Sequence, residues 1–204
     1  MEIYIARHGQ NEDNVNGILN GHRDLPLTAL GERQAQEAAG HIKKLQLRFD
    51  AVYSSPLVRA LKTAETISEV SQQPKPVIHP LLIERDFGVM TGLPSSVIKD
   101  KCAPDIIETD TVTYFLAPER AETFPDLIKR AQSLLVELEK KHDDEVLLLV
   151  THGDIGKMIY AAYYELPWRE VLTQFHFGNS ELLLLSSDSS PEEAHVFNLD
   201  QENH

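Results

Sequence analysis

Cysteine, long apolar runs and clusters of basic residues are nearly absent from this sequence. Cys102 is the only cysteine, so no disulfide can form within the chain, and nothing resembles the spacing of zinc ligands. No stretch approaches the roughly 18 consecutive apolar residues that a membrane span needs. The N-terminal residues also lack the basic segment and long apolar core of a secretory signal. We therefore expect a soluble, cytoplasmic protein with no membrane partner.

The charge balance is acidic. The chain has 19 Lys and Arg against 32 Asp and Glu, a formal net charge of -13. Affinity for a nucleic-acid backbone comes from clustered cations that release counterions, and no basic stripe is visible here. We therefore expect no nucleic-acid partner. A few converging cations can still bind a small phosphate, because the local field decides that contact.

Strand-like and helix-like segments alternate along the chain, which predicts an α/β fold with helices on both faces of a sheet. With 42% hydrophobic residues, the length suits one large domain or two small ones, and we favour one domain over 1-204. The apolar run 146–150 is typical of a central strand. Other predicted strands are 2–6, 50–53, 77–78, 182–185 and 195–199, and helices are predicted after Thr28, after 54–56 and over 124–138.

Residues 93-118 do not fit this alternation. They mix Pro94, Pro104 and Pro118 with short apolar pieces. We interpret them as an inserted lid or an irregular helical segment, because long connections of this kind are often functional.

Two histidines follow predicted strands directly. His8 comes after the strand ending at Ala6, and His152 after the strand ending at Val150. In such sheets, ligands bind beyond the carboxyl ends of the strands. A single histidine there is more often structural, but two at matching positions indicate a shared crevice if the strands are neighbours. Each is followed by glycine, which lets the backbone pass close to a bound group.

Arg59 and Glu84 are candidates for the same site. Arg59 lies early in the helix after 54–56, where a cation opposes the helix dipole unless an anion is also present. Alone it would be read as a solvated surface residue. Glu84 is surrounded in sequence by apolar residues that could desolvate it and raise its pKa toward that of a general acid. These neighbours are Leu81, Leu82, Ile83 and Phe87.

Five blocks together carry a family resemblance. They are "RHG" (7 to 9), "GHRDLPLTALGERQA" (21 to 35), "SSPLVRALKTAE" (54 to 65), "ERDFG" (84 to 88) and "VTHGD" (150 to 154). In this order they resemble the histidine phosphatase superfamily, which has the phosphoglycerate-mutase-like fold. The stretch "AETFPDLIKRA" (121 to 131) is also similar to that family. The resemblance implies a three-layer sandwich with a mixed, mostly parallel central sheet.

The resemblance also implies catalytic roles. His8 would attack phosphorus and become a phosphohistidine, for which it must be neutral; the adjacent Arg7 lowers its pKa. Arg7, Arg59 and His152 would surround the non-bridging oxygens and neutralise transition-state charge. Glu84 would protonate the leaving alkoxide and then take a proton from water.

Substrate-binding residues are implied by position. Asn14 matches an asparagine that contacts phosphate or substrate, although it could instead hold its loop through an Asx turn. The resemblance implies no metal and no cofactor, so the reaction should survive chelation. Gln10, Gly21, Arg85, Gly153 and Asp154 are the other pocket residues carried over from the family.

This sequence departs from the family pattern at a few positions. Asn11 stands where many members have threonine, which puts a hydroxyl contact to phosphate in doubt. Thr91 precedes Gly92 where the family often has glutamate. We expect these changes to tune substrate choice.

Three functions remain open. Cofactor-dependent phosphoglycerate mutases usually have tyrosine where this chain has Phe87, and an arginine pair in the insertion, where 93-118 offer only Lys99 and Lys101. We therefore favour a phosphatase acting on a small phosphorylated metabolite, with a 2,3-bisphosphoglycerate-dependent phosphoglycerate mutase as the alternative. A non-catalytic phosphate-binding protein is a third possibility, but it predicts loss of catalytic residues, and all are present. The physiological substrate and the oligomeric state stay open.

Overall fold

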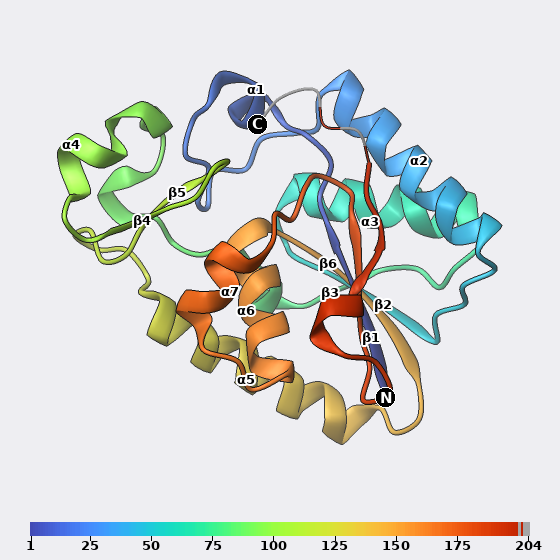
Figure 1. Cartoon of the computed structure of the whole chain (residues 1–204). Helices are drawn as coiled ribbons and strands as arrows, with labels where there is room; N and C mark the ends of the chain where they lie inside the picture. The colour runs from blue at the N-terminus through green and yellow to red at the C-terminus, as the bar shows by residue number, and fades with distance from the viewer. Residues whose placement is uncertain (200, 202–204) are drawn as a thin grey trace.

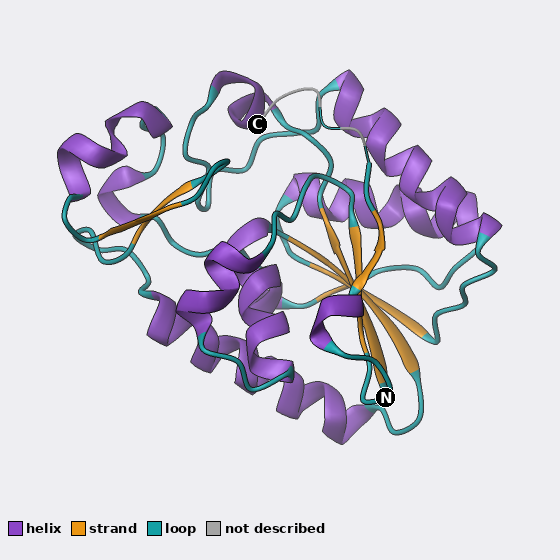
Figure 2. Ribbon diagram, viewed as in Figure 1, coloured by secondary structure: helices purple, strands orange, loops and turns teal. Residues whose placement is uncertain are grey.

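A six-stranded sheet forms the centre of the molecule (Figures 1 and 2). The computed structural model describes residues 1–199 and 201, so Asp200 and 202–204 of the predicted domain lie outside the described residues. The strand order is β3-β2-β6-β1-β7-β8; the first four strands are parallel, and β7 and β8 run antiparallel. This confirms the predicted mixed, mostly parallel sheet. The strands are β1 (Glu2–Arg7), β2 (Ala51–Ser54), β3 (Val77–Ile78), β6 (Val146–Thr151), β7 (Leu182–Leu185) and β8 (His195–Phe197).

Strands β1 and β6 are neighbours at the centre of the sheet. They pair in parallel from Glu2 opposite Val146 to Arg7 opposite Thr151. Both strands therefore end at the same edge, and His8 and His152 follow them directly. Because the two strands are parallel neighbours, both imidazoles lie on the same side of the molecule, which was the condition for a shared crevice.

Helices cover both faces of the sheet, as predicted (Figures 1 and 2). Successive side chains of β1 point to opposite faces. Ile3 and Ile5 pack in one core with α5, α6 and α7, whereas Tyr4 and Ala6 pack in the other with α2 and α3. The three-layer arrangement follows from this alternation. The helices are α2 (Ala29–Lys44), α3 (Val58–Ser71), α5 (Phe124–Lys141), α6 (Gly153–Tyr163) and α7 (Trp168–Gln174).

Some helices were predicted and others were not. Thr28 caps α2 as expected, because its Oγ1 accepts a hydrogen bond from the Gly31 N–H at 3.1 Å. Helices α6 and α7 were not predicted; α6 is buried on most sides, including Lys157, and so lacks a clear polar face. The five-residue helix α1 (Glu12–Asn16), which follows β1, was not predicted either.

The segment 93-118 stands apart from the central sheet (Figure 1). It contains the short helix α4 (Ile98–Cys102) and a hairpin of β4 (Ile106–Glu108) and β5 (Thr113–Phe115), which the sequence did not predict. A small core of its own holds it together, formed by Phe87, Met90, Ile98 and Phe115. Within the described part of the chain, no helix combines the length and apolarity needed to cross a membrane.

Candidate active site

A cavity of about 180 Å³ lies beyond the ends of β1 and β6. It brings together seven of the residues that the sequence singled out. The inserted segment contributes Val112 and Tyr114 to the same cavity. The seven predicted residues are Arg7, His8, Asn14, Arg59, Glu84, Gly153 and Asp154, whereas four others, His152, Gln10, Gly21 and Arg85, do not line it.

His8 is held as a neutral imidazole. Its Nδ1 lies 2.6 Å from the carbonyl oxygen of Gly9, which only accepts, so Nδ1 carries the proton. Nε2 then keeps its lone pair and accepts a hydrogen bond from Arg59 Nε at 3.2 Å. The pKa of His8 lies well below its usual value, first because of burial and then because of Arg59 and Arg7. The sequence assigned this effect to Arg7, but burial and Arg59 contribute more.

His152 lies beside His8 with the ring centroids 5.0 Å apart. Its Nε2 pairs with the Ser55 hydroxyl at 2.7 Å, and its buried Nδ1 has no hydrogen-bond partner among the described residues. Burial, followed by Arg59, lowers its pKa well below the usual value. Ser55 was not predicted as a site residue, although its place directly after β2, beside β6, is a signal that could have found it.

Arg59 is fully buried rather than solvated. Besides His8, its guanidinium donates to the carbonyl oxygens of Arg23 at 2.6 Å and Gly21 at 3.0 Å. Burial lowers its pKa to about 10, so it stays charged at neutral pH. Asp24 accepts from the Val58 N–H at 2.6 Å and supplies the anion at the start of α3. Gly21 therefore positions Arg59 rather than lining the cavity.

Arg7 is the second cation of the cavity. It donates from Nη1 to the Phe177 carbonyl oxygen at 2.6 Å, and its buried Nε has no hydrogen-bond partner among the described residues. Neither Arg7 nor Arg59 forms an ion pair with a carboxylate in residues 1–199 and 201. Buried charge without a counterion is costly, so this arrangement favours an anionic ligand.

Glu84 is a buried carboxyl group, 7% exposed. Its Oε1 accepts from the N–H groups of Arg85 at 2.8 Å and Ile155 at 3.2 Å, at the start of α6. Burial raises its pKa, and the nearby Asp154 raises it further, against these hydrogen bonds and Arg59. The predicted direction is confirmed. The contribution of Asp154 was not foreseen.

Arg85 and Asp154 form an ion pair of 2.8 Å behind the cavity. Arg85 is almost fully buried, and its guanidinium lies 4.4 Å from the ring centroids of both Phe115 and Phe124. Phe115 belongs to the inserted segment and Phe124 to α5. Arg85 therefore joins the insertion to the wall of the site instead of contacting the cavity itself.

Gln10 and Asn11 shape the loop after β1. The Gln10 side chain accepts from the Thr28 hydroxyl at 2.9 Å, which ties the loop to the start of α2. Asn11 is fully buried; it caps α1 and shares two side-chain hydrogen bonds with Asn20. Asn14 lines the cavity and also accepts from the Asn11 N–H at 3.1 Å, so it holds its loop and still faces the site.

Sequence reasoning missed Tyr114 and Lys157, which both line the cavity. Lys157 is buried in α6, and burial lowers its pKa to about 8. Its ammonium donates to the carbonyl oxygens at the end of α7. Neither residue carried a sequence signal, because the strand holding Tyr114 is three residues long and α6 was not predicted.

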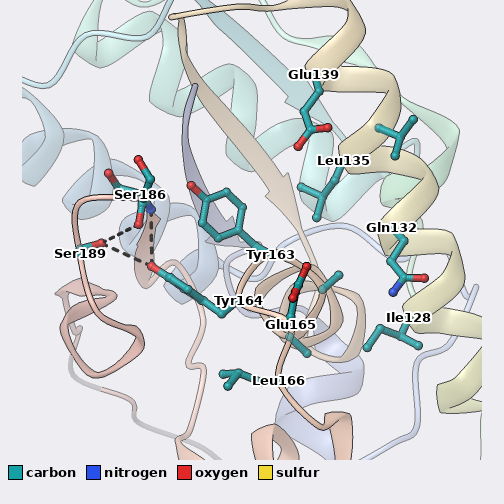
Figure 3. A pocket seen from close by; sticks show the side chains of 14 residues that line it. Ile128, Gln132, Leu135, Glu139, Tyr163, Tyr164, Glu165, Leu166, Ser186 and Ser189 are labelled. Carbon is teal, nitrogen blue, oxygen red and sulfur yellow. Dashed lines mark hydrogen bonds between the residues drawn. The ribbon is translucent and has the colours of Figure 1, made fainter.

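A larger hollow of about 810 Å³ lies between α5, the end of α6 and the turn holding Ser186 and Ser189 (Figure 3). We call it the α5–α6 groove. None of the residues singled out by the sequence lines it, and its described lining includes no Lys, Arg or His. The groove therefore lacks the groups that bind or transfer phosphate.

The chain belongs to the histidine phosphatase superfamily, because the model of its branch 1 matches residues 3–200. A 2,3-bisphosphoglycerate-dependent phosphoglycerate mutase of Bartonella bacilliformis is 29% identical over 176 residues, 84% of this chain and 85% of that protein. This confirms the resemblance noted from the five blocks.

Two solved structures with the same fold are named as phosphatases, whereas the sequence relative above is named as a mutase. A mycobacterial glucosyl-3-phosphoglycerate phosphatase with VO3 has a TM-score of 0.76 and 28% identity, covering 91% of this chain and 92% of that one. A phosphoserine phosphatase mutant from Entamoeba histolytica in complex with phosphoserine has a TM-score of 0.71 and 26% identity, covering 90% and 89%. Family and relatives together support an enzyme of the phosphatase or mutase type.

Proposed function

We propose that this chain is a phosphatase that hydrolyses a small phosphomonoester through a phosphohistidine on His8. One observation carries the proposal: a neutral His8, whose Nε2 accepts only the Arg59 hydrogen bond, lies in one small cavity with the guanidinium groups of the fully buried Arg59 and the partly buried Arg7. Neither arginine has a carboxylate partner among the described residues. A phosphoryl group supplies the missing negative charge. The cavity also holds Glu84, a carboxyl group whose pKa is raised.

In the proposed reaction, Arg7, Arg59 and His152 bind the non-bridging oxygens of the phosphoryl group. The unpartnered Arg7 Nε and His152 Nδ1 are the buried atoms that such oxygens would satisfy, Nδ1 as a donor in the tautomer with its proton there. Charge spread over these oxygens in the transition state is stabilised by fixed donors that need no reorganisation.

His8 Nε2 attacks phosphorus while Glu84 gives its proton to the leaving alkoxide oxygen. Glu84 then takes a proton from the water that attacks the phosphohistidine, which frees inorganic phosphate and restores both residues. Its raised pKa supports the first role, because a protonated carboxyl must be available near neutral pH.

A cofactor-dependent phosphoglycerate mutase is the second candidate. The names of the sequence relatives favour it. Hydrolysis is favoured by Phe87, which lines the cavity without a hydroxyl, and by the absence of arginine from the inserted segment 93-118. A mutase must keep water from its phosphohistidine. This chain lacks both the tyrosine and the arginine pair that are usual in those mutases.

We also propose that the chain works as one domain with 93-118 as a lid, since Val112 and Tyr114 help to enclose the cavity. Its partner would be a small phosphorylated metabolite; the phosphoserine bound to the Entamoeba histolytica relative supports this class. A cytoplasmic location stays a prediction, as does the lack of a nucleic-acid or membrane partner.

The test is phosphate release from an aryl phosphate by the wild type and by His8→Ala, with and without EDTA. We expect His8→Ala to lose activity by about 10³-fold or more, and EDTA to have no effect. Full activity in His8→Ala would contradict the phosphohistidine, and loss in EDTA would contradict a metal-independent reaction. Interconversion of 2- and 3-phosphoglycerate faster than phosphate release would assign the chain to the mutases.

A further inference from the structure

Tyr114 is fixed in the wall of the cavity by the main core. It lies on β5, is 7% exposed and packs edge-on against Phe124, with the ring centroids 6.1 Å apart. The next residue, Phe115, packs in the separate core of the inserted segment. Alternation along β5 therefore directs one ring into the insertion and the other toward the site.

The Tyr114 hydroxyl has no hydrogen-bond partner among the described residues, and its side chain lines the cavity. Burial raises its pKa, so the hydroxyl stays protonated. It is near enough to Arg7, Glu84 and Asp154 for their charges to influence that pKa. The phenol thus offers a hydrogen bond beside the proposed proton donor and one of the phosphate-binding cations.

Other polar side chains of this wall are already engaged. The Lys157 ammonium has three carbonyl partners, which match its three donors. Asn20 is paired with Asn11, and Asp154 with Arg85. Lys157 therefore has no hydrogen left to donate, whereas the Tyr114 hydroxyl, like the amide of Asn14 that also lines the cavity, can donate to the substrate.

The space around this hydroxyl is small and partly apolar. A cavity of about 180 Å³ holds the volume of about six waters at ~30 Å³ each. The phosphoryl group takes part of it, and the cavity is partly open to solvent, so the leaving alcohol extends past Tyr114 toward the opening. Apolar side chains line the rest, namely Ile18, Leu19, Phe87, Val112 and Phe177.

We infer that Tyr114 forms a leaving-group subsite, in which its hydroxyl hydrogen-bonds an oxygen on the alcohol part of the substrate. The inference rests on the proposed phosphatase function and narrows its substrate class to phosphomonoesters of alcohols that carry a second oxygen close to the ester. Tyr114 determines specificity and takes no part in bond making or breaking.

The test compares two substrates that differ in hydroxyl groups, glycerol 3-phosphate and propyl phosphate. In the wild type, kcat/KM should favour glycerol 3-phosphate. In Tyr114→Phe, which keeps the ring, this preference should fall by about three- to tenfold, the usual effect of one neutral hydrogen bond. Tyr163→Phe is the matched control, because Tyr163 lines the α5–α6 groove, and it should keep the wild-type preference.

An unchanged preference in Tyr114→Phe would overturn the subsite while leaving the phosphatase proposal intact. The same comparison is made by calorimetry in a His8→Ala background, where the Kd ratio of the two esters should shift by a similar factor on adding Tyr114→Phe. This readout needs no hydrolysis. If the wild type releases no phosphate from the aryl phosphate either, the phosphatase proposal fails, and an unshifted Kd ratio then overturns the subsite separately.

Discussion

Two hollows of this molecule, the cavity at the ends of β1 and β6 and the α5–α6 groove, differ in size and in chemistry. The α5–α6 groove is more than four times as large as the cavity at the ends of β1 and β6, at about 810 Å³ against 180 Å³. The largest pocket is the default hypothesis for an active site. Here the smaller hollow holds His8, Arg7 and Arg59, with His152 packed against His8, so the cost of burying charge favours it as the candidate site over the larger hollow.

The electrostatics of the two hollows are opposite. At the cavity, burial and the arginines lower the pKa of His8 and of the adjacent His152. In the groove, burial raises the pKa of Tyr163, and nearby carboxylates such as Glu2 and Glu139 raise it further. The cavity therefore attracts an anion, whereas the groove repels one. Four substitutions test this contrast.

The largest effect in this comparison should come from Glu84→Gln. The amide cannot supply a proton, so hydrolysis of esters with poor leaving groups should slow by about 10²- to 10⁴-fold, and that of activated aryl phosphates much less. Steady-state kinetics across a series of leaving groups measures this. Equal slowing across the series would contradict the role of Glu84 as an acid.

The same residue sets a pH dependence. Its pKa is raised, and the acid role needs the protonated form, so kcat for poor leaving groups should fall as pH rises through that pKa. The pKa of His8 is lowered, so His8 stays neutral and should cause no loss of activity as pH falls through 6.5. In Glu84→Gln the decrease on the alkaline side should disappear.

An intermediate effect is expected from Arg59→Lys. Lysine keeps a charge but cannot reproduce the hydrogen bonds to His8, Gly21 and Arg23. We expect kcat to fall by about 10²- to 10³-fold, as for loss of one transition-state donor, with weaker inhibition by vanadate. Arg33→Lys on the exposed surface of α2 is the control and should behave as wild type. Near-normal kinetics in Arg59→Lys would show that a positive charge at position 59 is enough for activity and that the guanidinium hydrogen bonds are not needed.

The smallest effect should come from the groove. Glu139→Gln and Tyr163→Phe alter its charge and polarity without touching the cavity, so kcat/KM should stay within about twofold of wild type and stability within ~0.5 kcal/mol. Phosphatase assays and thermal unfolding measure both. A large loss of activity would mean that the groove takes part in the reaction, and the contrast between the two hollows would fail.

Much of the fold could be predicted because it depends on local pattern. The apolar run of β6 and the Thr28 cap of α2 are properties of a few adjacent residues, and the structure confirms them. Helix α6 and the β4–β5 hairpin escaped prediction for opposite reasons: α6 is too buried to show a polar face, and strands of three residues are too short to show alternation.

The sequence by itself determined which reactive groups exist and which of them follow strands. The four candidates His8, His152, Arg59 and Glu84 were identified from it alone. Tertiary structure decided the hydrogen-bond partners, the burial and the pKa values of these groups. Arg59 is 51 residues from the His8 nitrogen to which it donates, and Ser55 is 97 from His152. Burial, the largest cause of each shifted pKa here, arises only when such distant segments pack together and exclude water. For the same reason, no local pattern pointed to Tyr114, whose hydroxyl reaches the cavity only through the packing of the inserted segment.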